Sequence, residues 1–111
     1  MLPPSVRVLV CRARQDMRKS FDTLAAVVRD SLREEPQSGA LYVFVGKRPT
    51  RVKVLWWDRN GYCLLSKRLH RAFFVLPDSS DGLASVDINA AALAQLLAGV
   101  ARERKKPRNL H

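Results

Sequence analysis

The stretch K-V-L-W-W-D-R-N-G-Y-C-L-L-S-K-R-L, residues 53–69, constrains the fold of this chain more than any other part of the sequence. Two apolar runs flank the tetrapeptide D-R-N-G, in which Asp58 and Gly61 occupy positions where a type I turn favours those residue types. The stretch therefore predicts an antiparallel hairpin between residues 52–57 and 62–69.

Two registers of this hairpin are open. In the first, Gly61 takes a left-handed conformation and forms a bulge after a type I turn; in the second, Asn60 and Gly61 form a two-residue loop. The two differ by one residue, and a slip of one residue exchanges the side chains that meet on each face of the sheet. We favour the bulged register.

The bulged register places the two tryptophans on different faces. The more apolar face then contains Val52, Val54, Trp56, Tyr62, Leu64 and Ser66, and the other contains Lys53, Leu55, Trp57, Cys63, Leu65 and Lys67. We expect Trp56 to be buried and Trp57 to be exposed beside lysines. The alternative is that helices cover both faces and both indoles belong to a core.

Four further elements follow from local patterns. Residues 6–11 and 40–46 are β-branched and aromatic, which is typical of strands, and the second reads as central because both of its faces are apolar. Asp16 is a candidate N-cap for a helix that ends near residue 34 or 35, before Pro36. The apolar stripe of that helix is Met17, Phe21, Leu24, Val28 and Leu32.

A second helix is predicted near the end of the chain. Asp87 or Asn89 can cap it, Gly99 lies near its end, and its apolar face would contain Leu93, Leu96, Leu97 and Val100. Because the three strands from residue 40 to 69 are joined by short loops, neighbouring pairs should be antiparallel. We expect an α+β domain over residues 1–101, with a mainly antiparallel sheet of four to five strands, two packed helices and a mobile basic tail at 102–111.

Catalytic and metal-binding chemistry finds little support in the sequence. The two histidines are His70 and the last residue, and Cys11 and Cys63 have no ligand spacing, so we expect no catalytic, metal or cofactor site. The carboxylates Asp16, Asp58 and Asp87 could hold Mg²⁺ only if they met in space, and each occupies a position where caps and turns favour Asp. No glycine-rich phosphate loop precedes a helix.

Charge gives the strongest functional indication. Twenty Lys and Arg against ten Asp and Glu give a net charge of +10, which attracts polyanions, nucleic acid before anionic membrane. The alternative is that the charge serves solubility alone. Clustered cations can neutralise phosphates, and an exposed aromatic can stack on a base. The candidate binding residues are Arg18, Lys19, Lys47, Arg48, Arg51, Lys53, Trp57, Arg59, Lys67 and Arg68.

Three segments together resemble a known family. D-M-R-K-S-F-D-T-L from Asp16, E-P-Q-S-G-A-L-Y-V-F from Glu35, and the hairpin stretch are similar to the TnpB-type accessory proteins of the bacterial insertion sequence family 66, which are distinct from RNA-guided nucleases of the same name. The resemblance covers residues 6–100 and includes the closing L-L-A-G-V. After Leu69 the chain reads H-R-A-F-F-V-L-P and departs from the family pattern.

The resemblance implies a non-enzymatic helper in DNA transposition, beside a separate transposase that performs strand transfer. DNA contact through the basic clusters and docking on that transposase, with Trp57 or Trp56 as an anchor, are two hypotheses from charge and exposed surface. The apolar runs are too short to span a membrane, and the isolated cysteines suit a reducing compartment, so we expect a cytoplasmic protein. No sequence feature fixes the oligomeric state.

Overall fold

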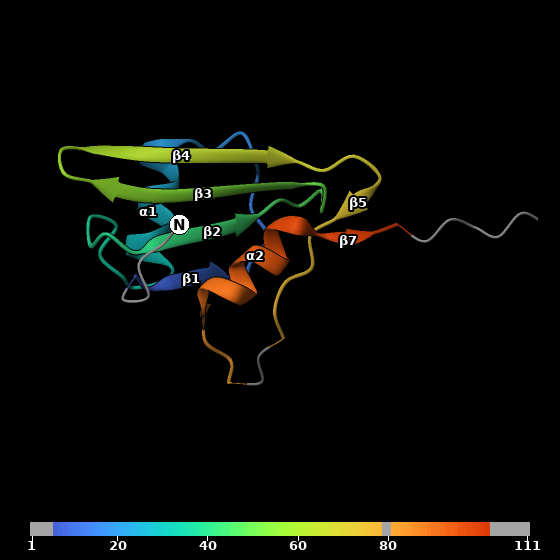
Figure 1. Ribbon diagram of the computed structural model, residues 1–111. Coiled ribbons are helices and arrows are strands. Elements are labelled where there is room, and N and C mark those ends of the chain that lie inside the picture. The colour runs from blue at the N-terminus through green and yellow to red at the C-terminus, as the bar shows by residue number, and fades with distance from the viewer. Residues whose placement is uncertain (1–5, 79–80, 103–111) are drawn as a thin grey trace, which may run out of the picture.

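The fold is a five-stranded sheet with one helix on each face, in a computed structural model that describes residues 6–78 and 81–102 (Figure 1). The strand order is β4-β3-β2-β1-β6, and a small second sheet pairs β5 with β7. The elements are β1 (Val8–Cys11), α1 (Phe21–Asp30), β2 (Leu41–Val45), β3 (Arg51–Asp58), β4 (Gly61–Arg68), β5 (Ala72–Phe73), β6 (Ser85–Ile88), α2 (Ala90–Ala98) and β7 (Val100–Ala101).

The predicted α+β class and the antiparallel order of β2, β3 and β4 are confirmed. β1 pairs with β2 in parallel, and α1 lies in the connection between them, as a parallel crossover requires. β6 then pairs with β1 antiparallel and closes the other edge. The sequence did not predict β6, because S-V-D-I is short and follows a polar loop.

The favoured hairpin register is wrong. Asp58 pairs with Gly61 and Trp57 with Tyr62, so Arg59 and Asn60 form a two-residue loop, one residue earlier than the alternative register placed it. Arg59 has a φ of 55°, the positive value that the favoured hairpin turns need at their first central residue. An arginine in this conformation is uncommon, and for this reason the pattern D-R-N-G pointed to Gly61 instead.

The observed register changes which side chains lie next to the two tryptophans. Trp56 lies beside Val54, as predicted, on the face that α2 covers, whereas Leu64, predicted to share that face, lies on the α1 face. The Trp57 ring contacts Tyr62 edge to face, with ring centroids 5.0 Å apart. Both indoles are half-buried, so the predicted contrast of one buried and one exposed tryptophan is wrong. Helices do cover both faces, but the hairpin extends beyond them.

Each face of the sheet has its own core. All five residues of β2 are buried, which confirms it as a central strand, and alternate side chains enter opposite cores. Phe44 packs on α1 through Leu24 and Val28, whereas Val43 packs on the α2 side with Phe74 and Leu93. Figure 1 shows α1 behind the sheet and α2 in front of it.

α1 is shorter than predicted. It begins after the N-cap Ser20, whose backbone N–H donates to the Thr23 hydroxyl at 2.8 Å, rather than at Asp16. It ends at Asp30, because the chain turns through Arg33 at a φ of 57° before reaching Pro36. Leu24, Val28 and Leu32 of the predicted stripe are buried, but Phe21 is 44% exposed.

α2 begins after Asn89, one of the two residues predicted as its N-cap. The Asn89 side chain accepts a hydrogen bond from the Ala92 N–H at 2.8 Å, which satisfies one free donor of the first turn. Gly99 ends the helix at a φ of 76°, and a Cβ at this position would overlap the Leu69 side chain. Val100 then leaves the helix for β7 and is half exposed, so its predicted place on the apolar face is wrong.

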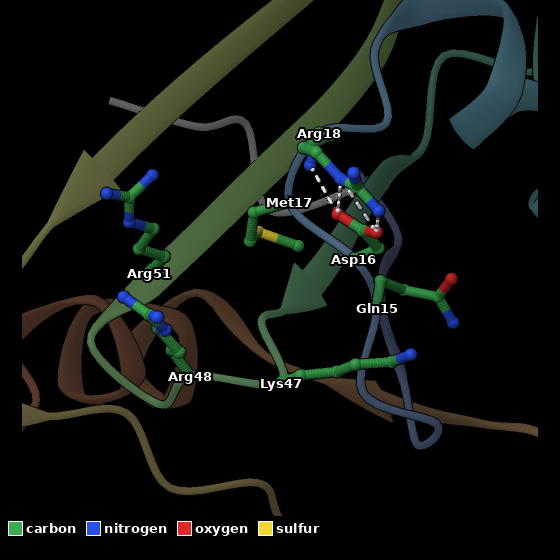
Figure 2. Close-up of a pocket in the computed structure, with 7 residues that line it drawn as sticks. All are labelled: Gln15, Asp16, Met17, Arg18, Lys47, Arg48 and Arg51. Carbon is green, nitrogen blue, oxygen red and sulfur yellow. Dashed lines mark hydrogen bonds and ion pairs between the residues drawn. The ribbon is translucent and has the colours of Figure 1, made fainter.

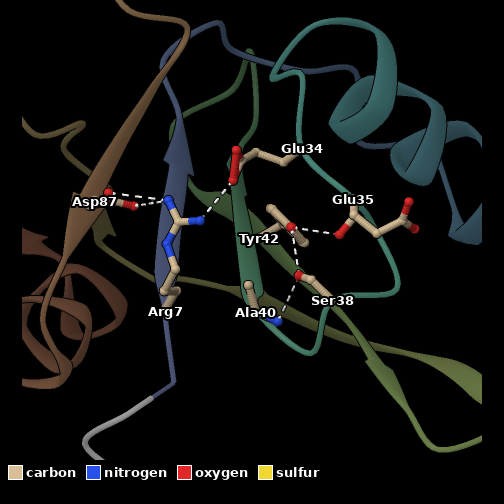
Figure 3. A network of polar contacts seen from close by, with 7 residues as sticks. All are labelled: Arg7, Glu34, Glu35, Ser38, Ala40, Tyr42 and Asp87. Carbon is tan, nitrogen blue, oxygen red and sulfur yellow. Dashed lines mark hydrogen bonds and ion pairs between the residues drawn. The ribbon is translucent and has the colours of Figure 1, made fainter.

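A polar network fixes the segment between α1 and β2 (Figure 3). Arg7 donates to Glu34 at 2.9 Å and to Asp87 of β6 at 3.2 Å. The buried Tyr42 hydroxyl donates to the Glu35 carbonyl oxygen at 2.8 Å and lies 3.0 Å from the Ser38 hydroxyl. Burial is the main cause that raises the pKa of Tyr42, so the phenol stays neutral and keeps this role.

Replacing Tyr42 with phenylalanine should lower the free energy of unfolding by about 1 to 2 kcal/mol, because the part-buried Glu35 carbonyl oxygen loses its donor. Urea unfolding of the wild type and the variant measures this change. Tyr62→Phe is the matched control and should cost less, because it removes the same hydroxyl from a tyrosine whose side chain makes no hydrogen bond within the described residues. Equal losses in the two variants would contradict the assignment.

Two further expectations stay predictions. Apart from Arg102, the basic tail at 102–111 lies outside the described residues, so its mobility and the boundary of the domain are untested. Among residues 6–78 and 81–102, no helix is long and apolar enough to cross a membrane.

Candidate nucleic-acid interface

Two loops that are distant in sequence are joined at one end of the sheet. The loop before α1 meets the loop between β2 and β3 through a bridge of Gln15 with Gly46. The Gln15 N–H donates to Val45 and the Lys47 N–H donates to Gln15, both at 2.9 Å. A Cβ at Gly46 would lie 2.7 Å from the Met17 side chain, so this close approach requires glycine.

Gln15 is buried and holds the first loop in shape. Its side-chain amide donates to the Ala13 carbonyl oxygen at 3.0 Å, and its side-chain oxygen accepts from the Lys19 ammonium at 2.8 Å. The adjacent Cys11 thiol is also buried, and burial raises its pKa, which makes it unreactive. Lys19, a predicted binding residue, is therefore engaged within the loop.

The joined loops form an open pocket of about 390 Å³, which we call the basic pocket (Figure 2). Three of its residues carry guanidinium groups, one is a lysine, and one is a carboxylate. The lining residues are Gln15, Asp16, Met17, Arg18, Lys47, Arg48 and Arg51. Four of the ten predicted binding residues thus meet at one site.

Asp16 and Arg18 form an ion pair at the rim of this pocket. Arg18 Nη2 lies 2.6 Å from Asp16 Oδ2, and the Arg18 backbone N–H donates to Asp16 Oδ1 at 2.9 Å. These bonds hold the pKa of Asp16 well below its ordinary value, with a smaller contribution from Lys47. Asp16, predicted as a helix cap, instead closes a turn onto Arg18.

The other three cations of the pocket are uncommitted. Within the described part of the chain, the side chains of Lys47, Arg48 and Arg51 make no hydrogen bond or ion pair, and all three are exposed. Arg51 also stands directly opposite Arg68 in the β3–β4 ladder. Like charges in such a position destabilise a sheet, and an anionic ligand would relieve that repulsion.

Of the remaining predicted residues, Arg68 lies beside the pocket, opposite Arg51, but neither it nor the others line the pocket. The Lys53 ammonium donates to the Lys19 carbonyl oxygen at 2.6 Å, and Lys67 caps the end of α2 through the Leu97 carbonyl oxygen at 2.8 Å. Trp57 and Arg59 lie at the opposite end of the hairpin, about 20 Å from Arg51 at the usual rise of a strand. Stacking by Trp57 on a base held in the pocket is thus excluded by distance.

Three pocket residues were not among the predicted binding residues, namely Gln15, Asp16 and Met17. The sequence carried one signal for them, because Asp at one position and Arg two residues later suit an Asx-type turn. The contact of Met17 with Gly46 left no local signal. It depends on a bridge between segments 31 residues apart in sequence, from Gln15 to Gly46.

A second cavity, about 440 Å³, lies near the hairpin tip on the α2 face, and we call it the apolar groove. Both indoles line it, and Leu65 at its edge is 42% exposed. Its lining residues are Val6, Gly39, Leu41, Val54, Trp56, Trp57, Asp58, Leu65, Leu93 and Leu97.

The three carboxylates considered for Mg²⁺ lie in separate places. Asp16 binds Arg18, Asp87 binds Arg7, and Asp58 faces Gly61 at the hairpin tip. Among the residues that the structure describes, no group of three His, Cys, Asp or Glu side chains is arranged to hold a metal ion.

A family model described as IS66 Orf2-like protein matches residues 6–107. The chain belongs to this family. Family membership confirms the resemblance noted from the sequence and associates the chain with transposition of insertion sequences. The IS66 Orf2-like match includes every residue of both the basic pocket and the apolar groove.

Two relatives from Sinorhizobium fredii are similar to the chain over nearly its whole length. Uncharacterized protein y4hO is 40% identical over 102 residues, which cover 90% of this chain and 87% of the relative. Uncharacterized protein y4jC is 31% identical over 111 residues, covering 96% and 93%. No solved structure matches the chain.

Proposed function

We propose that this chain is a non-catalytic accessory protein for transposition that binds duplex DNA through the basic pocket. The observation that carries the proposal is the set of three exposed, uncommitted cations, Lys47, Arg48 and Arg51, in one pocket. Phosphate contacts from such residues supply affinity without reading sequence. The net charge of +10 supports the same partner.

The positive surface at this end of the sheet is not limited to the pocket, which suits contact with successive phosphates of a DNA backbone. The Arg68 guanidinium, opposite Arg51 on the edge strand β4, extends the positive surface beyond the pocket. Bidentate guanidinium groups match phosphate geometry better than ammonium groups do, and three of the pocket's four cations are arginines.

Salt dependence tests the proposal. Affinity for a duplex taken from the ends of an insertion sequence, measured by fluorescence anisotropy, should fall steeply as salt rises from about 50 to about 200 mM, because bound protein displaces counterions. The logarithm of the association constant should decline linearly with the logarithm of salt concentration. Undetectable binding at low salt, or affinity that stays flat across the range, would refute the proposal.

The apolar groove favours a second candidate function, docking on the element's transposase. Aromatic anchors in concave apolar sites dominate protein interfaces, and both tryptophans line this groove. Because the groove and the basic pocket lie at opposite ends of the hairpin, one chain could use both. A partner bound by the groove would persist at about 1 M salt, where the Debye length is about 3 Å.

Replacing Leu65 with serine should abolish retention of the transposase at about 1 M salt while DNA affinity stays within about twofold, since the change removes apolar contact and no charge. Pull-down with the purified transposase measures the first effect. Phe21→Ser is the matched control, because Phe21 is exposed to nearly the same extent, 44% against 42%, but lies on α1 outside the groove. Equal loss in both variants would argue against docking in the groove.

A further inference from the structure

We propose that Asp16 occupies on Arg18 the place that a DNA phosphate would take, so that a bound phosphate must compete with a carboxylate of the protein itself. The inference rests on the proposed DNA-binding function. It adds that Asp16 limits which cations of the basic pocket are free to bind phosphate. Its basis is the geometry of the pair together with its position among three uncommitted cations.

The Arg18 guanidinium is engaged as it would be by phosphate. Its Nη2 donates to Asp16 Oδ2 at 2.6 Å, and its Nε lies 3.0 Å from Oδ2 and 3.1 Å from Oδ1. Carboxylate and phosphate oxygens use the same paired donors of arginine. As long as this pair persists, the Nε and Nη2 donors that face Asp16 are not available to an incoming anion.

The two partners differ in their freedom to move. The Arg18 side chain is 91% exposed and packs on little, so rotating it away costs little contact. The Asp16 side chain is only 33% exposed, and its carbonyl oxygen accepts from the Lys19 N–H at 3.1 Å within the turn. An anion entering the pocket would therefore draw Arg18 outward and leave Asp16 in place.

This exchange changes the ion balance of binding. Arg18 gains a phosphate, but the released Asp16 carboxylate attracts a cation from solution, so the exchange releases almost no net counterion. The Asp16 carboxylate is ionised in neutral solution in both states: hydrogen bonds from Arg18 hold its pKa well below the ordinary value while the pair is formed, and after release an ordinary Asp titrates only at about pH 4. The competition is thus a fixed property of the pocket at physiological pH.

Replacing Asp16 with asparagine should free Arg18 for phosphate and increase the magnitude of the salt slope by about one, with tighter binding at low salt. Asp30→Asn is the matched control, because Asp30 is exposed at the end of α1 and its replacement adds the same unit of charge away from the pocket. The control should raise affinity slightly without changing the slope.

Arg18→Gln is a second test of the inference, and in the wild-type background it does not depend on how well the Asp16 variant folds. In the wild-type background it should leave the slope unchanged, and in the Asp16→Asn background it should reduce the slope by about one. Equal slopes for Asp16→Asn and Asp30→Asn, or a reduction of about one from Arg18→Gln alone, would overturn the inference. Neither outcome affects DNA binding itself, which the wild-type titration establishes first.

Discussion

Replacing Arg48 and Arg51 together with glutamine should lower the affinity for duplex DNA by about 10- to 100-fold at about 50 mM salt, and should reduce the salt slope by about two. Both side chains line the basic pocket without a partner in the described part of the chain, so each is available for one phosphate. Glutamine keeps the length and polarity of the side chain while removing the charge. Anisotropy titrations at several salt concentrations give both quantities.

Arg29→Gln with Arg33→Gln is the matched control, since it removes the same two charges from α1 and the turn after it, outside the pocket. It should lower affinity only slightly, through the smaller net charge. If the two double variants lose affinity equally, binding follows overall charge and the pocket is no specific site. Neither variant should lose thermal stability, because all four side chains are exposed, and removing the charge of Arg51 also removes its repulsion with Arg68.

The elements that local chemistry dictates could be predicted from the sequence. Residues 40–46 carry apolar side chains on both faces, which is typical of a strand covered on both sides, and β2 is buried at all five positions. Asn89 begins α2 because its side chain satisfies a donor of the first turn. Short connections then forced antiparallel pairing of β2, β3 and β4.

The hairpin register could not be predicted because it depends on one backbone angle. A positive φ is far cheaper for Gly61 than for Arg59, yet pairing Asp58 with Gly61 gives eight matched pairs between β3 and β4. It also places Leu64 and Leu55 together in the core against α1. Tertiary burial therefore outweighed the local preference of the turn, and the face of each side chain in β4 changed with it.

The candidate site was also predictable only in part, because the sequence marks clusters of neighbouring charges but not contacts between distant loops. Lys47, Arg48 and Arg51 are neighbours in one basic loop, so composition alone marked them. Their meeting with Arg18 requires the bridge between Gln15 and Gly46, a contact between loops with no periodic pattern. Lys53 and Lys67 were marked by the same charge criterion, but backbone carbonyl groups bind their ammonium groups instead.

Replacing Phe44 with alanine should lower the free energy of unfolding by about 3 to 5 kcal/mol, the largest stability effect we expect in this chain. Phe44 is fully buried in the central strand, where it fills the core between the sheet and α1 beside Leu24 and Val28. Removing the ring leaves a cavity that the rigid strand cannot close. Urea unfolding with a common m-value measures the loss, and Phe44→Leu should cost less than about 1.5 kcal/mol if the cavity is the cause.

Trp56→Ala is the comparison for Phe44→Ala, because the sequence predicted Trp56 to be a buried core residue. Although tryptophan is larger than phenylalanine, Trp56 is half-buried at the edge of the α2-side core and borders the apolar groove, so its loss should cost clearly less than that of Phe44. Trp57→Ala should cost a similar amount to Trp56→Ala, because Trp57 is also half-buried and packs on Tyr62. A larger loss from either tryptophan than from Phe44 would mean that the core lies at the hairpin tip rather than between β2 and α1.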